Sequence, residues 1–281
     1  MRNLEEILKE KIIANNSLGG GCIADSRKIK TESGKEYFVK SYSGSGNNIL
    51  QNEANGLREL SKSGAIRIPE VIHLDSEILV LDYIKTGSRK SNFSESFGQQ
   101  FAEMHKVNSE MFGFYEDNFI GATPQKNLPQ KENWIEFYLE NRLIFQFKFA
   151  ERNGYVDSRF RELFGKFEKI VPKLIEGSEE QPTLLHGDLW SGNYMVDEFG
   201  EPVLIDPAVY YGHREADLGM TRLFGGFDPI FYSAYNEAYP LPDGWDERIE
   251  LYKFYHVINH LNLFGTGYLS QTISIMKDYL R

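Results

Sequence analysis

The stretch LLHGDLWSGN, residues 184–193, constrains this chain more than any other segment. Its Asp188 and Asn193 have the spacing Asp-x-x-x-x-Asn, and Asp206 follows thirteen residues after Asn193, at the end of VLID. Asn193 and Asp206 carry the kind of oxygen atoms that Mg²⁺ prefers as ligands. Asp188 is then free to accept a proton from a hydroxyl group. Each residue alone is also a common turn former, so the pattern needs support from elsewhere in the chain.

A glycine run near the N-terminus is a first candidate for such support. Gly19, Gly20 and Gly21 lie between two strand-like runs. Glycine allows backbone N–H groups to approach a phosphate closely. An ordinary hairpin loop explains three glycines about equally well, so this signal is weak by itself.

Lys40 and Glu53 form a more informative pair. Lys40 ends the predicted strand KEYFVKSY, where it shares a face with Phe38. Glu53 lies within the apolar stripe of a predicted helix, residues 48–63, where an unpaired carboxylate would be costly to bury. Lys40 is its natural partner, and such a pair can hold an ammonium group against the phosphates of a nucleotide. The alternative is a lysine whose stem covers apolar surface while its ammonium reaches water.

The order in which these residues occur is more specific than any one of them. A glycine loop, Lys, Glu, Asp-x₄-Asn and Asp follow one another as in the protein-kinase-like fold. Only ten residues separate Asp206 from Asp217 of READL, and Pro207-Ala208 stands where protein kinases have Phe-Gly. That leaves no room for an activation loop. The spacing therefore favours a kinase that acts on small molecules.

The pattern of elements predicts an α+β fold with two lobes. A strand-rich first third, including RIPEVIHLD and SEILVLDYI, precedes a helix-rich remainder that contains only short strand candidates such as PTLLHGDL and GEPVLIDP. We place the boundary near residues 84–87. The prediction is a small β-rich N-terminal nucleotide-binding lobe, residues 1–85, and a larger helical C-terminal lobe, residues 86–281, with the catalytic loop and the acceptor site.

Composition excludes several classes of protein. The formal net charge of −10 argues against a nucleic-acid-binding surface. No stretch approaches the roughly 20 apolar residues that span a bilayer. The N-terminal MRNLEEILKE is amphipathic, with Leu4, Ile7, Leu8 and Ile12 on one face, and lacks the features of a signal peptide. A single cysteine allows no internal disulfide. We expect a cytoplasmic protein without nucleic-acid or membrane partners.

The chain resembles the fructosamine kinase (ketosamine 3-kinase) family over nearly its whole length. The likeness is carried by GGGCI, FGFYEDNFIGATPQKN, HGDLWSGN, IDPAVYYGHREADLGMTRLFGGF, FYSAYNEAYPL and LYKFYHVINHLNLFG. The resemblance implies ATP- and Mg²⁺-dependent phosphorylation of the third-carbon hydroxyl of ketosamines, free or on protein lysines. The phosphorylated adduct then falls apart and frees the amine, which makes the activity a deglycation. Bacterial-type members of the family often prefer ribulosamines to fructosamines.

The resemblance also implies a role for individual residues. Lys40 and Glu53 would position phosphates, Asp188 would be the general base, and Asn193 and Asp206 would bind Mg²⁺. The hinge that reads adenine would be Leu81–Ile84, with Asp82, Tyr83 and Ile84 as its contacts. His186 and Asp217 would support the catalytic loop. Trp190 and His260 would belong to the acceptor site. For Trp190 and His260, packing in the core is the alternative. His256 and His260 are too few ligands to suggest a metal site.

Three questions stay open in the sequence. Cys22, in the glycine loop, is a candidate for a redox-linked homodimer, against the alternative of a small apolar residue in a monomer. A different amino-sugar or aminoglycoside-type kinase is the runner-up function, and a pseudokinase binding module is a more distant one. Every expected catalytic position holds a competent residue, which favours an active enzyme.

Overall fold

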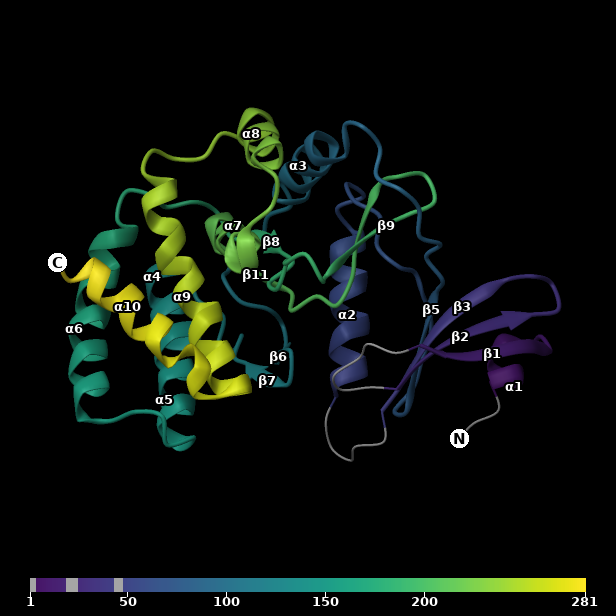
Figure 1. The fold of residues 1–281 in the computed structure, drawn as a ribbon, viewed down its shortest axis with the longest axis horizontal. Helices are drawn as coiled ribbons and strands as arrows, with labels where there is room; N and C mark the ends of the chain where they lie inside the picture. Colours follow the sequence, from purple (N-terminus) through teal and green to yellow (C-terminus); the bar gives the residue numbers. More distant parts are fainter. Residues whose placement is uncertain (1–3, 19–24, 43–47) are drawn as a thin grey trace.

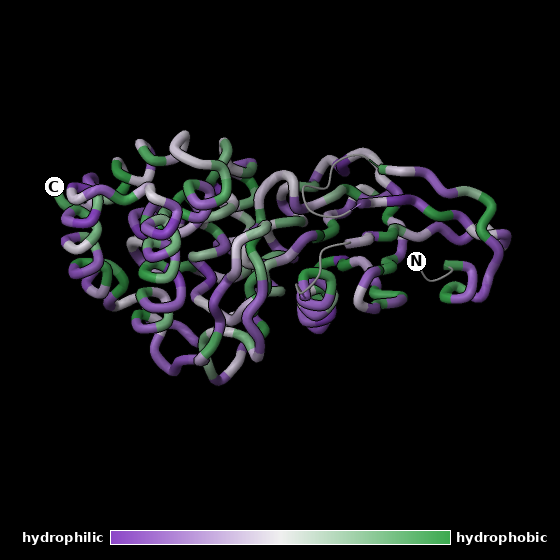
Figure 2. Tube along the Cα trace, turned by 90° about the horizontal axis from the view of Figure 1, so that it is seen from below, coloured by the Kyte–Doolittle hydropathy of each residue, from purple (hydrophilic) through white to green (hydrophobic). Residues whose placement is uncertain are grey.

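A computed structural model of the protein describes residues 4–18, 25–42 and 48–281, and it has two parts (Figure 1). A strand-rich N-terminal part and a helical C-terminal part meet along α2 and β9, and the same division is visible from below (Figure 2). No described helix combines the length and the hydropathy that a bilayer crossing requires.

The N-terminal part is a five-stranded antiparallel sheet with the strand order β1-β2-β3-β5-β4. The strands are β1 (Ile12–Leu18), β2 (Asp25–Thr31), β3 (Glu36–Ser41), β4 (Val71–Leu74) and β5 (Ile78–Asp82). Helix α2 (Ile49–Ser61) covers one face, where Leu50 and Leu57 pack against Leu79 and Leu81 of β5. Apolar side chains on one face of the sheet and the apolar stripe of the predicted 48–63 helix therefore pack together in one small core.

The first helix is shorter than its amphipathic pattern suggests. Helix α1 (Leu4–Leu8) ends before Lys9, which has a φ of 53°. Ile12 belongs to β1, and its N–H donates to a Glu5 carboxylate oxygen over 2.8 Å. Ile12 nevertheless packs with Leu4 and Leu8 against the second face of the sheet, so the apolar side is kept although the helix stops.

The C-terminal part is a set of helices around one large apolar core. Its helices are α3 (Phe93–Met104), α4 (Trp134–Phe137), the π-helix Tyr138–Ile144, α5 (Phe145–Arg152), α6 (Ser158–Ile175), α7 (Arg214–Thr221), α8 (Pro229–Ala238), α9 (Trp245–Phe264) and α10 (Leu269–Tyr279), with 3₁₀ turns at Leu223–Gly225 and Thr266–Tyr268. Phenylalanine and tyrosine rings of α3 and α8 interlock, and α9 runs through the middle of the part (Figure 1).

Three short antiparallel pairs lie among these helices. They are β6 (Asn118–Ile120) with β7 (Thr123–Gln125), β8 (Thr183–Leu185) with β11 (Tyr210–Gly212), and β9 (Tyr194–Val196) with β10 (Pro202–Leu204). The stretch LLHGDLWSGN covers the end of β8 and the whole loop between β8 and β9, and β10 leads to Asp206. Both segments therefore emerge from the helical part toward the sheet.

Helix α2 connects the two parts at the level of these loops. Gly56 packs so closely on the segment after β10 that a Cβ there would lie 3.1 Å from Pro207. The Leu204 N–H donates to the Arg67 carbonyl over 3.1 Å, just beyond the end of α2. These contacts place the Glu53 side of α2 beside Asp206.

Candidate active site

A buried carboxylate holds the beginning of the loop between β8 and β9. Asp217 of α7 accepts the backbone N–H of His186 over 2.7 Å and that of Gly187 over 2.8 Å. Burial alone would raise the pKa of Asp217, but hydrogen bonds from the His105 ring and the Gly187 backbone lower it overall. The loop is therefore fixed by an ionised group, in the bracing arrangement expected of Asp217.

The same loop is locked to the segment that follows β10. His186 Nε2 donates to the Ile205 carbonyl over 3.0 Å, and the Ala208 N–H donates to the His186 carbonyl over 2.9 Å. Gly187 has a φ of 82°, and a Cβ on it would lie 2.0 Å from the Ala208 oxygen. Only glycine fits this crossing. His186 thus acts on the loop through hydrogen bonds and stays buried.

Asp188 follows at the point where the loop faces the other part of the molecule. Asn193 donates its side-chain N–H₂ to the Asp188 carbonyl over 2.7 Å and to its carboxylate over 3.1 Å. Burial raises the pKa of Asp188 well above its usual range, the Asn193 hydrogen bond opposes this, and the charges of Asp206 and Asp217 add to it. A raised pKa brings this carboxylate closer to the range in which a general base is effective.

Lys40, Glu53 and Asp206 converge from three elements. Lys40 Nζ at the end of β3 lies 2.7 Å from a Glu53 carboxylate oxygen on α2, and it also contacts Asp206 Oδ1. Burial would lower the pKa of Lys40, but the two carboxylates raise it overall, so the ammonium stays charged. Burial raises the pKa of Glu53, and Lys40 counteracts this. The lysine is held between the two parts of the molecule.

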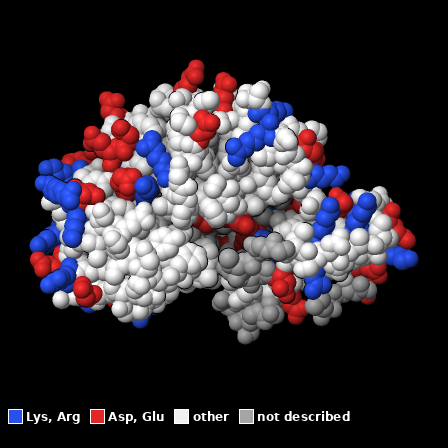
Figure 3. Space-filling view, viewed as in Figure 1, with Lys and Arg blue, Asp and Glu red and all other residues white. Residues whose placement is uncertain are grey.

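These charges lie in a hollow. Figure 3 shows acidic side chains with a basic one at the bottom of the depression between the two parts. Asp206 is about half exposed, at 48% of its side chain, and has the uncommon φ of 52°. A carboxylate held outward in such a backbone conformation is available to a ligand.

The donor set fits a magnesium ion shared with a nucleotide. The side-chain nitrogen of Asn193 donates to Asp188, so the side-chain oxygen of Asn193 points away from Asp188. Lys40 contacts Asp206 through Oδ1 only. Among the described residues no group of three His, Cys, Asp or Glu side chains could bind a metal by itself. That is the usual case for Mg²⁺, which takes one or two protein oxygens and completes its shell with phosphates and water.

The predicted hinge is partly occupied by backbone hydrogen bonds. The Asp82 N–H donates to the Glu70 carbonyl over 3.0 Å and the Tyr83 N–H to the Glu36 carbonyl over 3.3 Å. The Asp82 side chain accepts from the Glu70 N–H and lies 3.7 Å from Arg67. For the N–H of Ile84, no acceptor is found within the described ranges, and the adenine-reading role of these residues stays a prediction.

Four predicted positions lie outside the residues that the structure describes. They are Gly19, Gly20, Gly21 and Cys22, between β1 and β2. Their assignments to phosphate binding and to redox linkage stay predictions.

Trp190 and His260 lie on opposite sides of a third ring, Phe224. The Phe224 centroid is 5.5 Å from that of Trp190 and 5.2 Å from that of His260, with edge-to-face geometry in both contacts. The His260 ring donates Nδ1–H to the backbone carbonyl of His256, one turn earlier in α9, over 2.6 Å. The two residues thus share one aromatic cluster with Phe224, which begins two positions after Asp188 in the sequence, and neither is fully buried.

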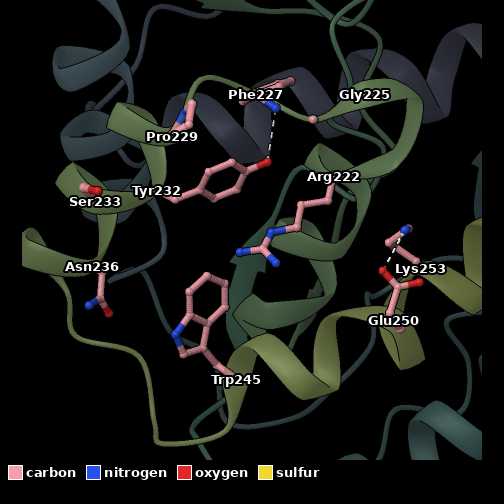
Figure 4. A pocket seen from close by; sticks show the side chains of 11 residues that line it. Arg222, Gly225, Phe227, Pro229, Tyr232, Ser233, Asn236, Trp245, Glu250 and Lys253 are labelled. Atoms are coloured by element: carbon pink, nitrogen blue, oxygen red, sulfur yellow. Dashed lines mark hydrogen bonds and ion pairs between the residues drawn. The ribbon is translucent and has the colours of Figure 1, made fainter. Parts of the chain in front are cut away.

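An open cavity of about 550 Å³ lies beside Gly225, the residue after Phe224. It is lined by residues of the turn after α7 and of α8 and α9, and Arg222 projects into it between Tyr232 and Trp245 (Figure 4). It does not contain Asp188 or Lys40. Its lining includes none of Trp190, Phe224 and His260, so this cavity is distinct from the aromatic cluster as well as from the charged residues.

Three parts of the site were missing from the sequence-based prediction. Asp206 as a second partner of Lys40 could not be inferred, because 166 positions separate the two residues. The sequence analysis gave His105 no role, although its ring joins Asp217 to Tyr235. The sequence analysis also gave Phe224 no role, and the only signal for its backbone conformation in the sequence is the pair of glycines that follows it.

Comparison with known proteins shows the family of this chain. The family model described as fructosamine kinase matches residues 2–281. The chain belongs to the fructosamine kinase family. A chloroplastic protein-ribulosamine 3-kinase of Oryza sativa subsp. indica is 41% identical over 96% of this chain and 80% of its own length. A crystal structure of a Thermobifida fusca protein, provisionally named a fructosamine-3-kinase, superposes with a TM-score of 0.91 at 31% identity, covering 99% of this chain and 97% of that one.

The fold is shared more widely than the family. An ADP-bound aminoglycoside phosphotransferase, 14% identical, superposes with a TM-score of 0.68 over 97% of this chain and 94% of its own. The α+β, two-lobed kinase-like fold is therefore confirmed, and the chain is a phosphotransferase by family.

Proposed function

We propose that this kinase transfers the γ-phosphoryl group of Mg-ATP to the third-carbon hydroxyl of a ketosamine. The observation that carries the proposal is the convergence of Lys40, Glu53 and Asp206 beside the loop of Asp188 and Asn193, at the hollow between the two parts. The name of the rice relative supplies the acceptor class, a protein-bound ribulosamine, and the family name adds fructosamines.

The residues of this chain divide the reaction between them. Lys40, kept charged by two carboxylates, holds the phosphates of the nucleotide. Asp188 accepts the proton of the acceptor hydroxyl as the new bond from oxygen to phosphorus forms and the bond to the ADP oxygen breaks. Asn193 orients the Asp188 carboxylate through its 3.1 Å hydrogen bond. Because little covalent chemistry is left to the protein, positioning and charge stabilisation carry most of the rate.

Magnesium would be held by Asn193 and Asp206. When bound, the ion neutralises charge that develops on the phosphate oxygens. The protein contributes two oxygen ligands and a lysine that already contacts one of those ligands. Removal of Mg²⁺ by a chelator should therefore abolish turnover.

The acceptor side favours a ketosamine over an aminoglycoside. The rings of Trp190, Phe224 and His260 form an aromatic cluster that begins two positions after Asp188, which suits one sugar with a slender amine substituent.

We further propose a cytoplasmic location on the ground of the single cysteine, whereas the name of the rice relative places that protein in the chloroplast.

The test is an ADP-release assay with a panel of acceptors. The protein with Mg-ATP is given ribulosamine, fructosamine, erythrulosamine and an aminoglycoside, each at equal concentration, with Asp188→Asn as the matched inactive control. Release of ADP that depends on a ketosamine is the expected result. Turnover of the aminoglycoside alone would support the runner-up, and nucleotide binding without turnover of any acceptor would indicate a pseudokinase.

A further inference from the structure

Phe224 has a backbone conformation that its side chain does not favour. Its φ of 58° and ψ of 38° lie in the left-handed region, within the 3₁₀ turn Leu223–Gly225. A bulky residue seldom adopts this region, and such outliers concentrate where a site requires them. The ring is also 49% exposed, so burial of its surface does not explain the conformation.

The neighbours of Phe224 force the turn from both sides. Leu223 is buried, and the Gly226 N–H donates to its carbonyl over 3.4 Å. The Phe227 N–H donates to the Tyr232 hydroxyl over 3.2 Å, while Arg222 projects into the cavity next to the Tyr232 ring (Figure 4). The turn is thus anchored at both ends, and Phe224 is the residue that it presents outward.

The direction of presentation is toward the acceptor side. The Phe224 ring touches Trp190, which lies two positions after Asp188, and it touches His260, whose ring lies 5.4 Å from that of Phe264. Ring contacts therefore form a row in the order Trp190, Phe224, His260 and Phe264, which starts two positions after Asp188 in the sequence. Phe264 is 64% exposed, so this row opens to solvent.

We propose that Phe224 is a specificity-determining residue that receives the protonated secondary amine of the ketosamine. The inference rests on the proposed function. In a ketosamine the amine is bonded to the first carbon, two carbons from the hydroxyl at Asp188. With the sugar against Trp190, the next ring outward meets the ammonium group. Ammonium groups are attracted to the face of an aromatic ring, and the attraction strengthens where water is displaced.

The ligand chemistry separates a ketosamine from a free sugar. An ether analogue, with oxygen in place of the amine, has the same length and the same third-carbon hydroxyl but no positive charge. Wild-type enzyme should prefer the ketosamine over this analogue, measured as kcat/KM or as the inhibition constant when the analogue only competes. A wild-type enzyme without that preference would overturn the inference.

Two variants at position 224, Phe224→Leu and Phe224→Tyr, test the role of the aromatic face. Phe224→Leu keeps the backbone strain and loses the aromatic face. It should reduce the preference for the amine several-fold to about 30-fold, as expected from the strength of cation–π contacts, with an unchanged KM for ATP. Phe224→Tyr should keep the preference. Phe199→Leu, which truncates another exposed ring in the β9–β10 turn, is the matched control and should change neither value.

Phe224→Gly distinguishes a functional ring from a structural one. Glycine adopts the left-handed region freely, so this variant should unfold at a higher temperature than wild type while it loses the amine preference. A lower unfolding temperature with an unchanged preference would show that the ring serves packing alone. If wild type phosphorylates no ketosamine, the proposed function fails; if it does and Phe224→Leu keeps the preference, only this inference fails.

Discussion

The two sides of the active site consist of different types of side chain, charged on one side and aromatic on the other. On the nucleotide side, three charged groups from β3, α2 and the segment after β10 satisfy one another through Lys40 before any ligand arrives. On the acceptor side, Trp190, Phe224 and His260 present rings. A phosphate site needs fixed charge, because charge must not reorganise during transfer. An acceptor site needs shape, because the sugar and its amine substituent are recognised by their surfaces.

Asp188 is the residue on which both sides depend, and its replacement should have the largest effect. Asp188→Asn keeps the size of the side chain but removes the base. We expect the turnover number to fall by about 10²–10⁴-fold with ATP affinity retained, measured by ADP release and by nucleotide titration. Near-normal turnover would show that another group takes the proton.

Lys40→Met tests the charge network on the nucleotide side. It leaves two carboxylates without their cation, so we expect a loss of stability of up to about 3 kcal/mol in urea unfolding and a raised KM for ATP. Adding Glu53→Gln should restore stability but not ATP use. The control is Lys35→Met, which removes an exposed lysine 3.1 Å from Glu10. A Lys40→Met variant as stable as this control would mean that the pair contributes nothing.

Gly192→Ala tests the ring surface without touching any charge. A Cβ at this position would lie 2.4 Å from carbons of the Trp190 ring, so the indole must move. We expect kcat/KM for the ketosamine to fall by about tenfold, since a misplacement of roughly 1 Å can cost more than that. The KM for ATP should stay constant. Gly165→Ala, at a site with no atom within 4 Å, is the control. An equal effect on both substrates would contradict the separation of the two sides.

The smallest effect concerns the helix beneath the rings. His256 of α9 is buried, and burial lowers its pKa to about 3. In the unfolded chain a histidine binds a proton near pH 6.5, so the folded protein is favoured above that pH and loses this contribution as pH falls. At pH 5.5 the loss is about 1.4 kcal/mol. Urea unfolding at pH 7.5 and 5.5 should show it, and His256→Gln should reduce the difference.

Wild type and His256→Gln are compared at both pH values, so that the difference between the two proteins reports the contribution of His256. A His256→Gln protein with the wild-type dependence would assign the acid sensitivity to other buried groups. His105 and His186 are the next candidates, because burial lowers the pKa of both.

The charged residues on the nucleotide side could be predicted from the sequence because phosphate binding and proton transfer require particular types of side chain. Glu53 within an apolar helical stripe predicted a cation partner, and the structure places Lys40 at 2.7 Å from it. The Asp188 and Asn193 spacing follows from one loop that must carry both side chains. Asp217 was assigned from the family resemblance, and the structure shows it accepting the backbone N–H groups of His186 and Gly187.

The acceptor side could not be read in the same way. The residue type of Phe224 does not show whether its side chain packs in a core or faces a ligand. Only its φ and its exposed fraction, both taken from the structure, distinguish the two roles. The extent of the first helix was also beyond the pattern, because the left-handed conformation of Lys9 ends it while Ile12 keeps its apolar contacts. Periodicity predicts which side of an element is buried more reliably than where the element stops.

The most direct test of the central claim is the position of the phosphate in the product. The claim is that the Asp188 carboxylate faces the hydroxyl of the third carbon while Lys40 holds the nucleotide. Phosphorus–proton correlation NMR during the reaction of ¹³C-labelled ribulosamine with Mg-ATP locates the new ester. We predict phosphorus coupled to the third carbon, one ADP per ester, and no ester with Asp188→Asn. A phosphate on another carbon, or ADP formed with free phosphate alone, would contradict the account.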